Sequence, residues 1–490
     1  MERLSERASG KVYVDGAIMH CSEALFEDRD CGEIVHAGLT AGKKIVWHSA
    51  PEFAKCFQRC ATTDRMRENE LQRYVVSLFE EAHARKAQDI HIIQTGDVTR
   101  VRLRILGELV DRDLQDGAFG QAVMALLYNY FAQQTGGAVF SPMQRLDGRI
   151  VNPKVLPQGI LSVRLHTEPI QSETRECGTF MTLRLLYDAT EARGSLDERL
   201  AKLGFLPKQQ TILTDLTRRE GLCVISGATG HGKSTLLKHI FEAMVCDVPG
   251  RSYLSVEDPP EYILEGVEQI QVVTQGSVRG GERRERYREA LAGALRSDPD
   301  VLMIGEIRYA EACATAVAAA QTGHSVWATL HANDVFGIVR RMESLLAETG
   351  VPEPRPRLLE PGVLSGLVHQ RLVPVLCPAC KEPFETVKNK DPALYERVAA
   401  VLSTDVVSVR GKGCAVCGGR GCVSMTLCAE VLTISPQVHD ALLKGDVAEA
   451  RALWKKEGGM TCLEVALSKC GQGLLDPRDI ERRLSCPVTG

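Results

Sequence analysis

The stretch Gly227-Ala-Thr-Gly-His-Gly-Lys-Ser-Thr235 satisfies the pattern G-x-x-x-x-G-K-S/T. It follows an apolar run, Leu222–Ser226, and precedes a helical pattern, Leu236–Val245, which is the context that a phosphate-binding loop requires. Glycines let backbone N–H groups turn inward around phosphates, and the helix N-terminus adds a favourable dipole. The alternative is a chance glycine-rich turn. We expect the loop to bind ATP through Gly227, Ala228, Thr229, Gly230, His231, Gly232, Lys233, Ser234 and Thr235.

Two residues of this loop have expected roles of their own. Lys233 should reach the β- and γ-phosphates, and the hydroxyl of Ser234 should hold Mg²⁺.

Bulk composition narrows the class of protein. The chain has 490 residues, of which 44% are hydrophobic and 25% charged, as in ordinary multidomain globular proteins. A net charge of -4 lacks the excess of basic residues that is typical of nucleic-acid-binding proteins, so no direct nucleic-acid partner is expected. The start, Met1–Arg7, lacks the apolar core of a signal peptide, and no apolar run reaches the ~18 residues that span a membrane. The 17 cysteines therefore indicate free thiols or metal ligands in a cytoplasmic protein.

The pattern of elements predicts an α/β protein of several parts. Near-continuous apolar strands alternate with helices after Gly221, which is typical of a parallel sheet covered on both faces. Alternating strands and amphipathic helices before that point indicate a separate α+β unit. The expected parts are a short N-terminal segment (1–62), an α+β domain (63–190), a linker (191–207), the ATPase domain (208–372), a tetracysteine region (373–430) and a C-terminal helical element (431–490).

Acidic residues follow two of the predicted strands. Glu306 comes after the apolar run Val301–Ile304, where a carboxylate beside the loop organises Mg²⁺ through water. Glu261 belongs to an acidic segment, Val256–Tyr262, after another strand, and transfer of phosphate to water needs a carboxylate that orients the nucleophile. A surface carboxylate and an acidic turn are the respective alternatives.

Two histidines, His324 and His331, flank a further apolar strand. Histidines at such places are most often hydrogen-bonded parts of the structure, and the neighbouring motifs are what favour a role in the site.

The cysteine pattern is a separate signal. Two C-x-x-C pairs offer four thiolates for a tetrahedral Zn²⁺, namely Cys377, Cys380, Cys414 and Cys417. With all four positions filled, the zinc would be structural rather than catalytic. Cys422 and Cys428 are extra thiols, either alternative ligands or, by preference, buried small residues.

These motifs together resemble the secretion ATPases of type II secretion and type IV pilus assembly (the GspE and PilB group). The resemblance rests on Ala87–Ile92, Gln144–Arg149, the acidic segment, Asp298–Arg308 and Gly323–Asn333, in that order. It implies a RecA-like P-loop core, a PAS-like N-terminal domain, and a homo-hexamer in the cytoplasm at the inner membrane. It also implies a platform protein as membrane partner. The zinc knuckles resemble those of assembly and export members.

The resemblance further implies residue roles. Glu261 matches the catalytic base, Glu306 the Walker-B glutamate, and His324 with His331 the pair that senses or positions the γ-phosphate. Arg164 and Arg184 match arginines that reach the nucleotide across the interdomain cleft.

The chain also departs from the family pattern. Ala228 and His231 replace the commoner Pro and Ser in the loop, and Tyr309 stands where Asp is usual. The expected function is ATP hydrolysis that drives pilus assembly or protein export. One alternative is a motor for a conjugative thin pilus, type IVB secretion or DNA uptake. The other is a nucleotide-binding scaffold with weak turnover.

Overall fold

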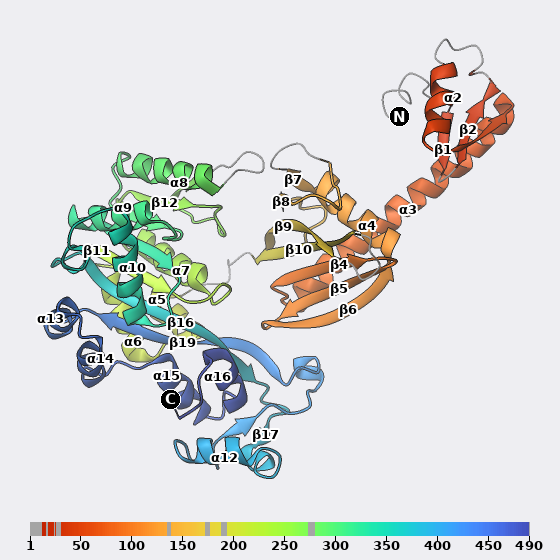
Figure 1. Ribbon diagram of the computed structural model, residues 1–490. Coiled ribbons are helices and arrows are strands. Elements are labelled where there is room, and N and C mark those ends of the chain that lie inside the picture. Colours follow the sequence, from red (N-terminus) through yellow and green to blue (C-terminus); the bar gives the residue numbers. More distant parts are fainter. Residues whose placement is uncertain are drawn as a thin grey trace.

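The computed structural model describes residues 12–15, 18–23, 25, 31–134, 139–171, 177–187, 194–272 and 280–489. The earliest described elements form a small unit at one end of the molecule (Figure 1). Strands β1 (Val12–Asp15), β2 (Ile18–Ser22) and β3 (Lys44–His48) make a three-stranded sheet, with helix α2 (Cys31–Thr40) beside it. Its small core contains Met19, Cys21, Leu25 and Ile34. The segment Met1–Arg7 lies outside the described residues.

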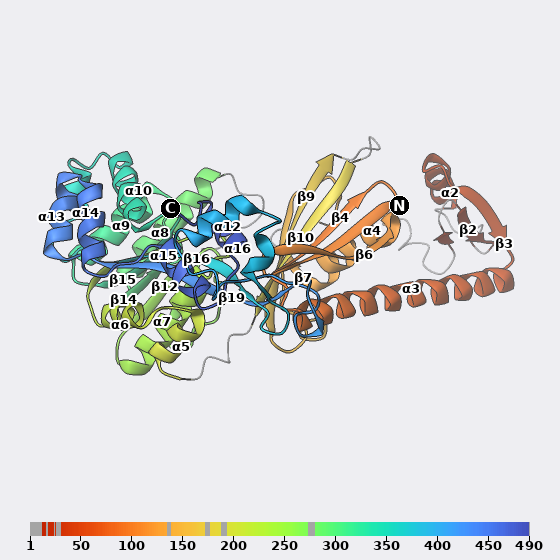
Figure 2. The ribbon, with the colours of Figure 1, turned by 90° about the horizontal axis from the view of Figure 1, so that it is seen from below.

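A long helix, α3 (Ala50–Ala84), leads from this unit to the next and stands out as a straight rod in Figure 2. Its second half carries apolar residues at helical spacing, of which Val75, Leu78 and Phe79 are fully buried. The boundary expected at residue 62 falls inside the helix, which runs through it without a break.

The next unit is built on a seven-stranded antiparallel sheet of order β6-β5-β4-β10-β9-β8-β7. Helix α4 (Gly117–Leu126) and the end of α3 pack against it around a shared apolar core. Its strands are β4 (Asp89–Thr95), β5 (Val98–Ile105), β6 (Glu108–Asp116), β7 (Ala132–Gln134), β8 (Leu146–Ile150), β9 (Ile160–Gln171) and β10 (Cys177–Tyr187). The α+β character expected for this part agrees with these elements. Its PAS-like nature stays a prediction.

The part of the chain expected to be the ATPase domain, called the ATPase unit below, contains the predicted parallel sheet. Its order is β13-β12-β14-β15-β11-β16-β19, and only the edge strand β19 runs antiparallel to its neighbour. Both faces are covered, so its central strands are buried throughout. The strands are β11 (Gly221–Ser226), β12 (Tyr253–Glu257), β13 (Glu268–Gln271), β14 (Val301–Ile304), β15 (Ser325–Leu330), β16 (Leu364–Leu376) and β19 (Cys422–Thr433).

The helices divide between the two faces of this sheet. One apolar core contains side chains of α8, α9 and α10, and the other contains those of α5, α6 and α7. The bounds are α5 (Leu196–Leu203), α6 (Pro207–Leu216), α7 (Lys233–Asp247), α8 (Gly280–Leu295), α9 (Ala310–Gln321), α10 (Val335–Glu348) and α11 (Pro354–Leu358). The stretch predicted as a linker, 191–207, thus holds helix α5, with a capping box at Ser195 and Glu198. Residues 191–193 lie outside the described part.

Beyond the sheet, β16 and β19 continue together as a two-stranded ribbon, with pairs reaching to Leu376 and Cys422. The tetracysteine region is the tip of this ribbon. Between its two C-x-x-C pairs lie β17 (Glu382–Pro383), α12 (Pro392–Ala399) and β18 (Ser408–Val409). The boundaries expected at 372 and 430 both fall within strands, so this region is an extension of the central sheet.

The C-terminal element is helical, as expected. Helices α13 (Pro436–Lys444) and α14 (Val447–Lys456) pack on the core of the ATPase unit, while α15 (Cys462–Cys470) and α16 (Pro477–Leu484) pack on the ribbon. Among the described residues, no helix is long and apolar enough to cross a lipid bilayer.

A closed ring of ion pairs joins the ribbon tip and α16 to the antiparallel unit. Glu108, at the start of β6, contacts Arg410 at 3.1 Å and Arg482 at 2.8 Å. Both arginines also contact Asp479, each at 2.7 Å. Beside the ring, Arg483 donates to the carbonyl of Leu106 at 2.9 Å. The start of strand β6 therefore contacts both the tetracysteine region and the last helix, α16.

Candidate functional site

The phosphate-binding loop joins the end of β11 to the start of α7, as predicted. Gly227, Gly230 and Gly232 all have left-handed φ values, of 156°, 76° and 79°. Such φ values turn successive N–H groups to one side of a loop, and other residues adopt them only with strain. At Gly227 a side chain is also excluded by space, because a Cβ there would lie 2.7 Å from the carbonyl oxygen of Gln370.

Lys233 begins α7 and lies over the loop. Its ammonium donates to the carbonyl oxygens of Gly227 at 2.9 Å and of Ala228 at 3.3 Å. Burial lowers the pKa of Lys233, and the carboxylates of Glu306 and Glu261 act against this shift. The lysine is thus close enough to both predicted catalytic carboxylates to interact with their charges.

The hydroxyl-bearing residues after Lys233 face the acidic segment. Ser234 lines a small cavity of about 30 Å³ together with Glu257 and Tyr262. Thr235 Oγ1 lies 3.1 Å from the hydroxyl of Tyr262. The hydroxyl of Ser234 is an oxygen ligand of the kind that Mg²⁺ prefers, whereas the side chain of Lys238, which lines the same cavity, disfavours a cation inside it. When bound, Mg²⁺ neutralises charge on the β- and γ-phosphates.

Glu257 precedes Glu261 in the acidic segment and was not singled out from the sequence. Its carboxylate accepts hydrogen bonds from Ser255 at 2.8 Å and Gln269 at 2.9 Å. Burial raises the pKa of Glu257, with these hydrogen bonds acting against the shift. Gln269 belongs to β13, where nothing in the sequence pattern marks it as a partner.

Glu306 and His331 meet at the neighbouring strand ends. His331 Nε2 lies 3.2 Å from Glu306 Oε1, and Arg308 contacts the other carboxylate oxygen at 2.6 Å. The hydroxyl of Tyr287, from α8, lies 3.2 Å from the carbonyl oxygen of Glu306 and helps to fix this turn. Glu306 follows β14 and His331 follows β15, so both lie at the edge of the sheet where the phosphate-binding loop lies.

The structure does not bring His324 to this site. His324 precedes β15, and its carbonyl accepts from Gly221 N–H at the start of β11, while the phosphate loop follows the other end of that strand. Its ring contacts Thr322 Oγ1 at 2.9 Å and the carbonyl of Ala319 at 3.0 Å. The two predicted histidines therefore lie at opposite ends of β15, about 20 Å apart within one chain, and a role of His324 at the nucleotide stays a prediction.

The two predicted arginines lie on adjacent strands of the antiparallel unit, where Arg164 of β9 pairs in register with Arg184 of β10. Arg184 contacts Asp89 at 3.0 Å and so is held within its own sheet. Desolvation lowers the pKa of Arg164, Arg283 of the ATPase unit adds to this shift, and Asp258 acts against it. Arg164 is therefore close enough to Asp258 of the acidic segment for the two charges to interact.

Arg283 is a further charged residue that the sequence did not single out. It lies in α8 and contacts Asp258 at 2.6 Å, next to the charge of Arg164. Other arginines of this basic helix pair with nearby acids, as in Arg284 with Glu311 and Arg288 with Glu285.

Tyr309 occupies the N-cap of α9 and makes no side-chain capping hydrogen bond. The Asp usual in the family would be a strong cap there, so the substitution removes one. The ring of Tyr309 instead faces the guanidinium of Arg284, 5.7 Å from its centre.

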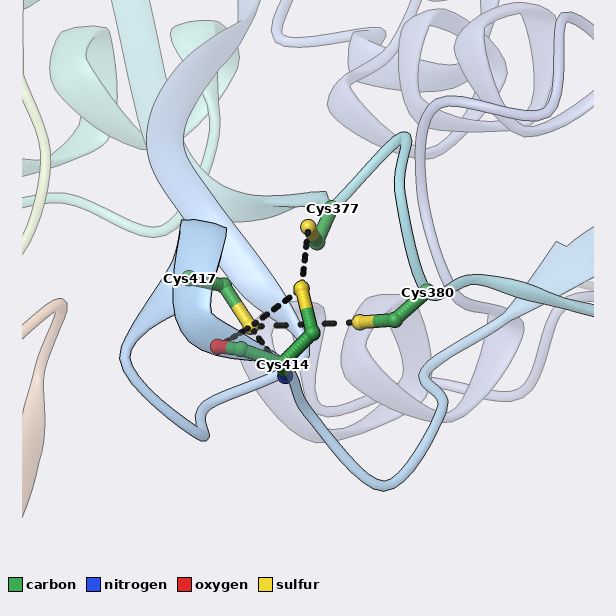
Figure 3. Close-up of side chains that lie close together, drawn as sticks. All are labelled: Cys377, Cys380, Cys414 and Cys417. Atoms are coloured by element: carbon green, nitrogen blue, oxygen red, sulfur yellow. Dashed lines mark hydrogen bonds between the residues drawn. The ribbon is translucent and has the colours of Figure 1, made fainter.

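The four predicted cysteine ligands converge at the tip of the ribbon, with their sulfurs directed at one another (Figure 3). The Cys377–Cys414 and Cys380–Cys417 sulfurs are both 3.8 Å apart, and those of Cys414 and Cys417 are 3.9 Å apart. Zn–S bonds of about 2.3 Å in a tetrahedron place neighbouring sulfurs about 3.8 Å apart, so the cluster has the size that zinc requires.

The environment of these sulfurs also suits a metal-bound thiolate. The backbone N–H groups of Cys414 and Gly421 point at Cys417 Sγ, from 3.2 and 3.1 Å. They lower the pKa of the Cys417 thiol to about 6. Cys422 and Cys428 lie outside the cluster and are buried, which confirms the preferred interpretation of these two thiols.

Comparisons with known proteins identify the family of this chain. The family model described as "Type II/IV secretion system protein" matches residues 64–482. The type IV pilus assembly ATPase PilB of Thermus thermophilus is 29% identical over 90% of this chain, which spans only 46% of that protein. The putative type II secretion system protein E of Escherichia coli is 28% identical, with 88% of this chain and 86% of that protein covered.

Solved structures show the same fold. The ATPase DotB of Legionella pneumophila aligns with a TM-score of 0.56 at 20% identity, covering 82% of this chain and 93% of that one. The pilus retraction motor PilT, solved with bound ADP, gives 0.53 at 21% identity, with 83% and 96% covered. The match to the family model extends over both the antiparallel unit and the ATPase unit, and this chain therefore belongs to the type II/IV secretion system protein family.

Proposed function

We propose that this chain is a Mg²⁺-dependent ATPase that powers type IV pilus assembly or type II protein secretion. The observation that carries the proposal is the gathering of Lys233, Glu261, Glu306 and His331 around one edge of the parallel sheet. Family membership supports the same activity, because the named relatives are secretion and pilus ATPases. Glu261 is the proposed base, and it would orient or deprotonate the attacking water.

The other residues have supporting roles in this scheme. The loop glycines and Lys233 would bind the phosphates, and Ser234 and Glu306 would hold Mg²⁺. His331 contacts Glu306 and would report the state of the γ-phosphate to that carboxylate. Arg164 and Arg184 would reach the nucleotide only after the antiparallel unit moves, because Arg184 is held by Asp89 in the present arrangement.

The proposal includes an assembly and a place of action. The chain would work as a homo-hexamer in the cytoplasm, bound at the inner membrane to a platform protein of its machine. The tetracysteine cluster would hold one structural Zn²⁺ that fastens the ribbon tip, since its four thiols leave no ligand position open.

The test is steady-state hydrolysis of Mg-ATP by the wild type and a Glu261→Gln variant. We expect the variant to lose kcat by about a hundredfold or more while still binding nucleotide, as for removal of a general base. Glu265→Gln is the matched control, since Glu265 is an exposed glutamate shortly after the acidic segment.

The outcomes separate the alternatives. Absence of turnover by the wild type, even with its membrane partner present, would favour a nucleotide-binding scaffold. Turnover that rises several-fold on addition of DNA would favour a motor for conjugation or DNA uptake.

A further inference from the structure

Strand β16 continues past the end of its neighbour β11, and the phosphate loop lies against this overhang. The last pair in the register is Ser226 with His369, so Gln370 and the residues after it have no β11 partner. The close approach of Gly227 to the Gln370 carbonyl, noted above, marks where the loop meets the overhang. On its other edge the overhang pairs with β19 up to Leu376.

His231 connects the loop to this overhang through two hydrogen bonds. The backbone N–H of Leu372 donates to His231 Nδ1 at 3.2 Å, and the side-chain amide of Gln370 donates to the carbonyl oxygen of His231 at 2.6 Å. Gln370 is fully buried beneath the loop. A strand N–H that has lost its partner strand needs another acceptor, and the imidazole supplies it.

Within the loop itself, the backbone N–H of His231 also donates to the carbonyl oxygen of Ala228 at 3.2 Å. His231 stands between Gly230 and Gly232, and a Cβ at Gly230 would meet no atom within 4 Å. The backbone at His231 leads directly into Gly232 and Lys233, whose N–H groups and ammonium are expected at the phosphates. A contact that fixes both the side chain and the carbonyl of His231 therefore fixes the orientation of the adjoining peptides.

The chemistry of the ring agrees with this contact. An imidazole accepts a hydrogen bond at Nδ1 only when it is neutral and carries its proton on Nε2. Burial, with the charges of Arg371, Arg483 and Lys233, lowers the pKa of His231 to about 4. The ring is therefore neutral near pH 7 and able to accept.

We propose that His231 is a positioning residue, which holds the phosphate loop on the β16 overhang in the shape that receives nucleotide. This inference rests on the proposed function. It assigns a role to His231, which stands where the family usually has Ser. It also means that the phosphate loop is tied to the strand that ends one residue before Cys377.

The test compares two substitutions of His231 for binding of a fluorescent ATP analogue with Mg²⁺ and for steady-state kinetics. Asn can place its Oδ1 near the position of Nδ1 and keep the acceptor, whereas Leu cannot. We expect His231→Leu to raise Kd and KM by about tenfold with little change in kcat, because a buried donor is left without a partner. His231→Asn should stay within about twofold of the wild type.

Further variants separate positioning from folding. Gln370→Met removes the second contact and should raise Kd in the same direction. His439→Leu is the matched control, because His439 also contacts a backbone carbonyl, that of Leu359 at 2.6 Å, but lies in α13 away from the loop.

The outcomes are distinct from those of the proposed function. If the wild type binds the analogue and His231→Leu binds it equally well, the inference is overturned. If His231→Leu only lowers the thermal unfolding midpoint without changing Kd, a purely structural role replaces it. Failure of the proposed ATPase activity would instead show in the wild type, as binding without turnover.

Discussion

The ring of ion pairs around Glu108 predicts how firmly the antiparallel unit is docked on the ATPase unit. Substituting Glu108→Gln keeps the size of the side chain and removes its charge. Although partial burial alone raises the pKa of Glu108, Arg482 and Arg410 outweigh this effect and the pKa lies below its ordinary value. The carboxylate is therefore charged near pH 7, and the variant loses two ion pairs between the units.

The expected loss of docking free energy follows from how exposed the paired side chains are. Side chains of Glu108 and Arg482 are 38% and 54% exposed, so their pair is well solvated, while Arg410 is only 20% exposed. Pairs of this kind contribute about 0.2–1 kcal/mol each. Both arginines keep Asp479 as a partner in the variant, so neither is left without a counter-charge. We expect docking to weaken by about 1 kcal/mol, or roughly fivefold in its equilibrium.

Hydrogen exchange measured by mass spectrometry should detect this change. Peptides that cover residues 104–110 and helix α16 should exchange roughly fivefold faster in Glu108→Gln, while peptides from the parallel sheet stay unchanged. Asp111→Asn is the matched control, because Asp111 lies on the same strand and pairs with Arg102 of β5 at 2.9 Å, within the antiparallel unit.

Salt provides a second check, since about 0.5 M NaCl screens solvated pairs and should bring the wild type towards the variant. Equal exchange rates in Glu108→Gln and Asp111→Asn would refute the reasoning.

Three further predictions concern the metal, the histidines and pH. The purified protein should hold about one zinc per chain, and elemental analysis should find it lost in Cys380→Ser but kept in a variant of the exposed Cys246, Cys246→Ser. His331→Asn should lower kcat by about tenfold or more and His324→Asn by clearly less, since only His331 contacts Glu306; equal losses in steady-state assays would contradict the placement. Burial lowers the pKa of His369 from 6.5 to about 4. As the pH falls, the His369 imidazole is therefore protonated in the unfolded chain at a higher pH than in the folded chain. That residue's contribution to stability is therefore complete above pH 6.5 and declines as the pH falls towards about 4. Denaturant titrations from about pH 7.5 to about pH 5 should show a loss larger by on the order of 2 kcal/mol in the wild type than in His369→Asn, and parallel losses would count against it.

The sequence predicted the parts of the site that depend on local pattern. The loop, its flanking strand and helix, and the strands before Glu306 and Glu257 lie where apolar runs and turn residues indicated them. Direction along a strand explains why the structure separates His324 from His331. Two histidines that flank one strand are close in sequence, but an extended strand places them at opposite edges of a parallel sheet.

Other features needed three-dimensional information. The contacts of His231 with Gln370 and Leu372 join residues about 140 positions apart, and no periodicity reports such a pairing. The interpretation of residues 191–207 as a linker rests on their polar composition with scattered Gly and Pro, which hid the apolar face that helix α5 packs on its core. The domain boundaries at 372 and 430 followed changes in composition, whereas the backbone hydrogen bonds of β16 and β19 continue through both.

The unbroken course of β16 and β19 has a consequence for dissecting this molecule. A fragment that ends at residue 372 would stop inside β16 and would leave this strand without its antiparallel partner β19. Exchange of the tetracysteine tip between relatives should therefore move both strands together, from Gly366 to Thr433, with helices α15 and α16 that cover them. A shorter graft would disrupt the pairing of β16 with β19 next to the phosphate loop. The region that looks like a removable module in the sequence is thus inseparable from the nucleotide site.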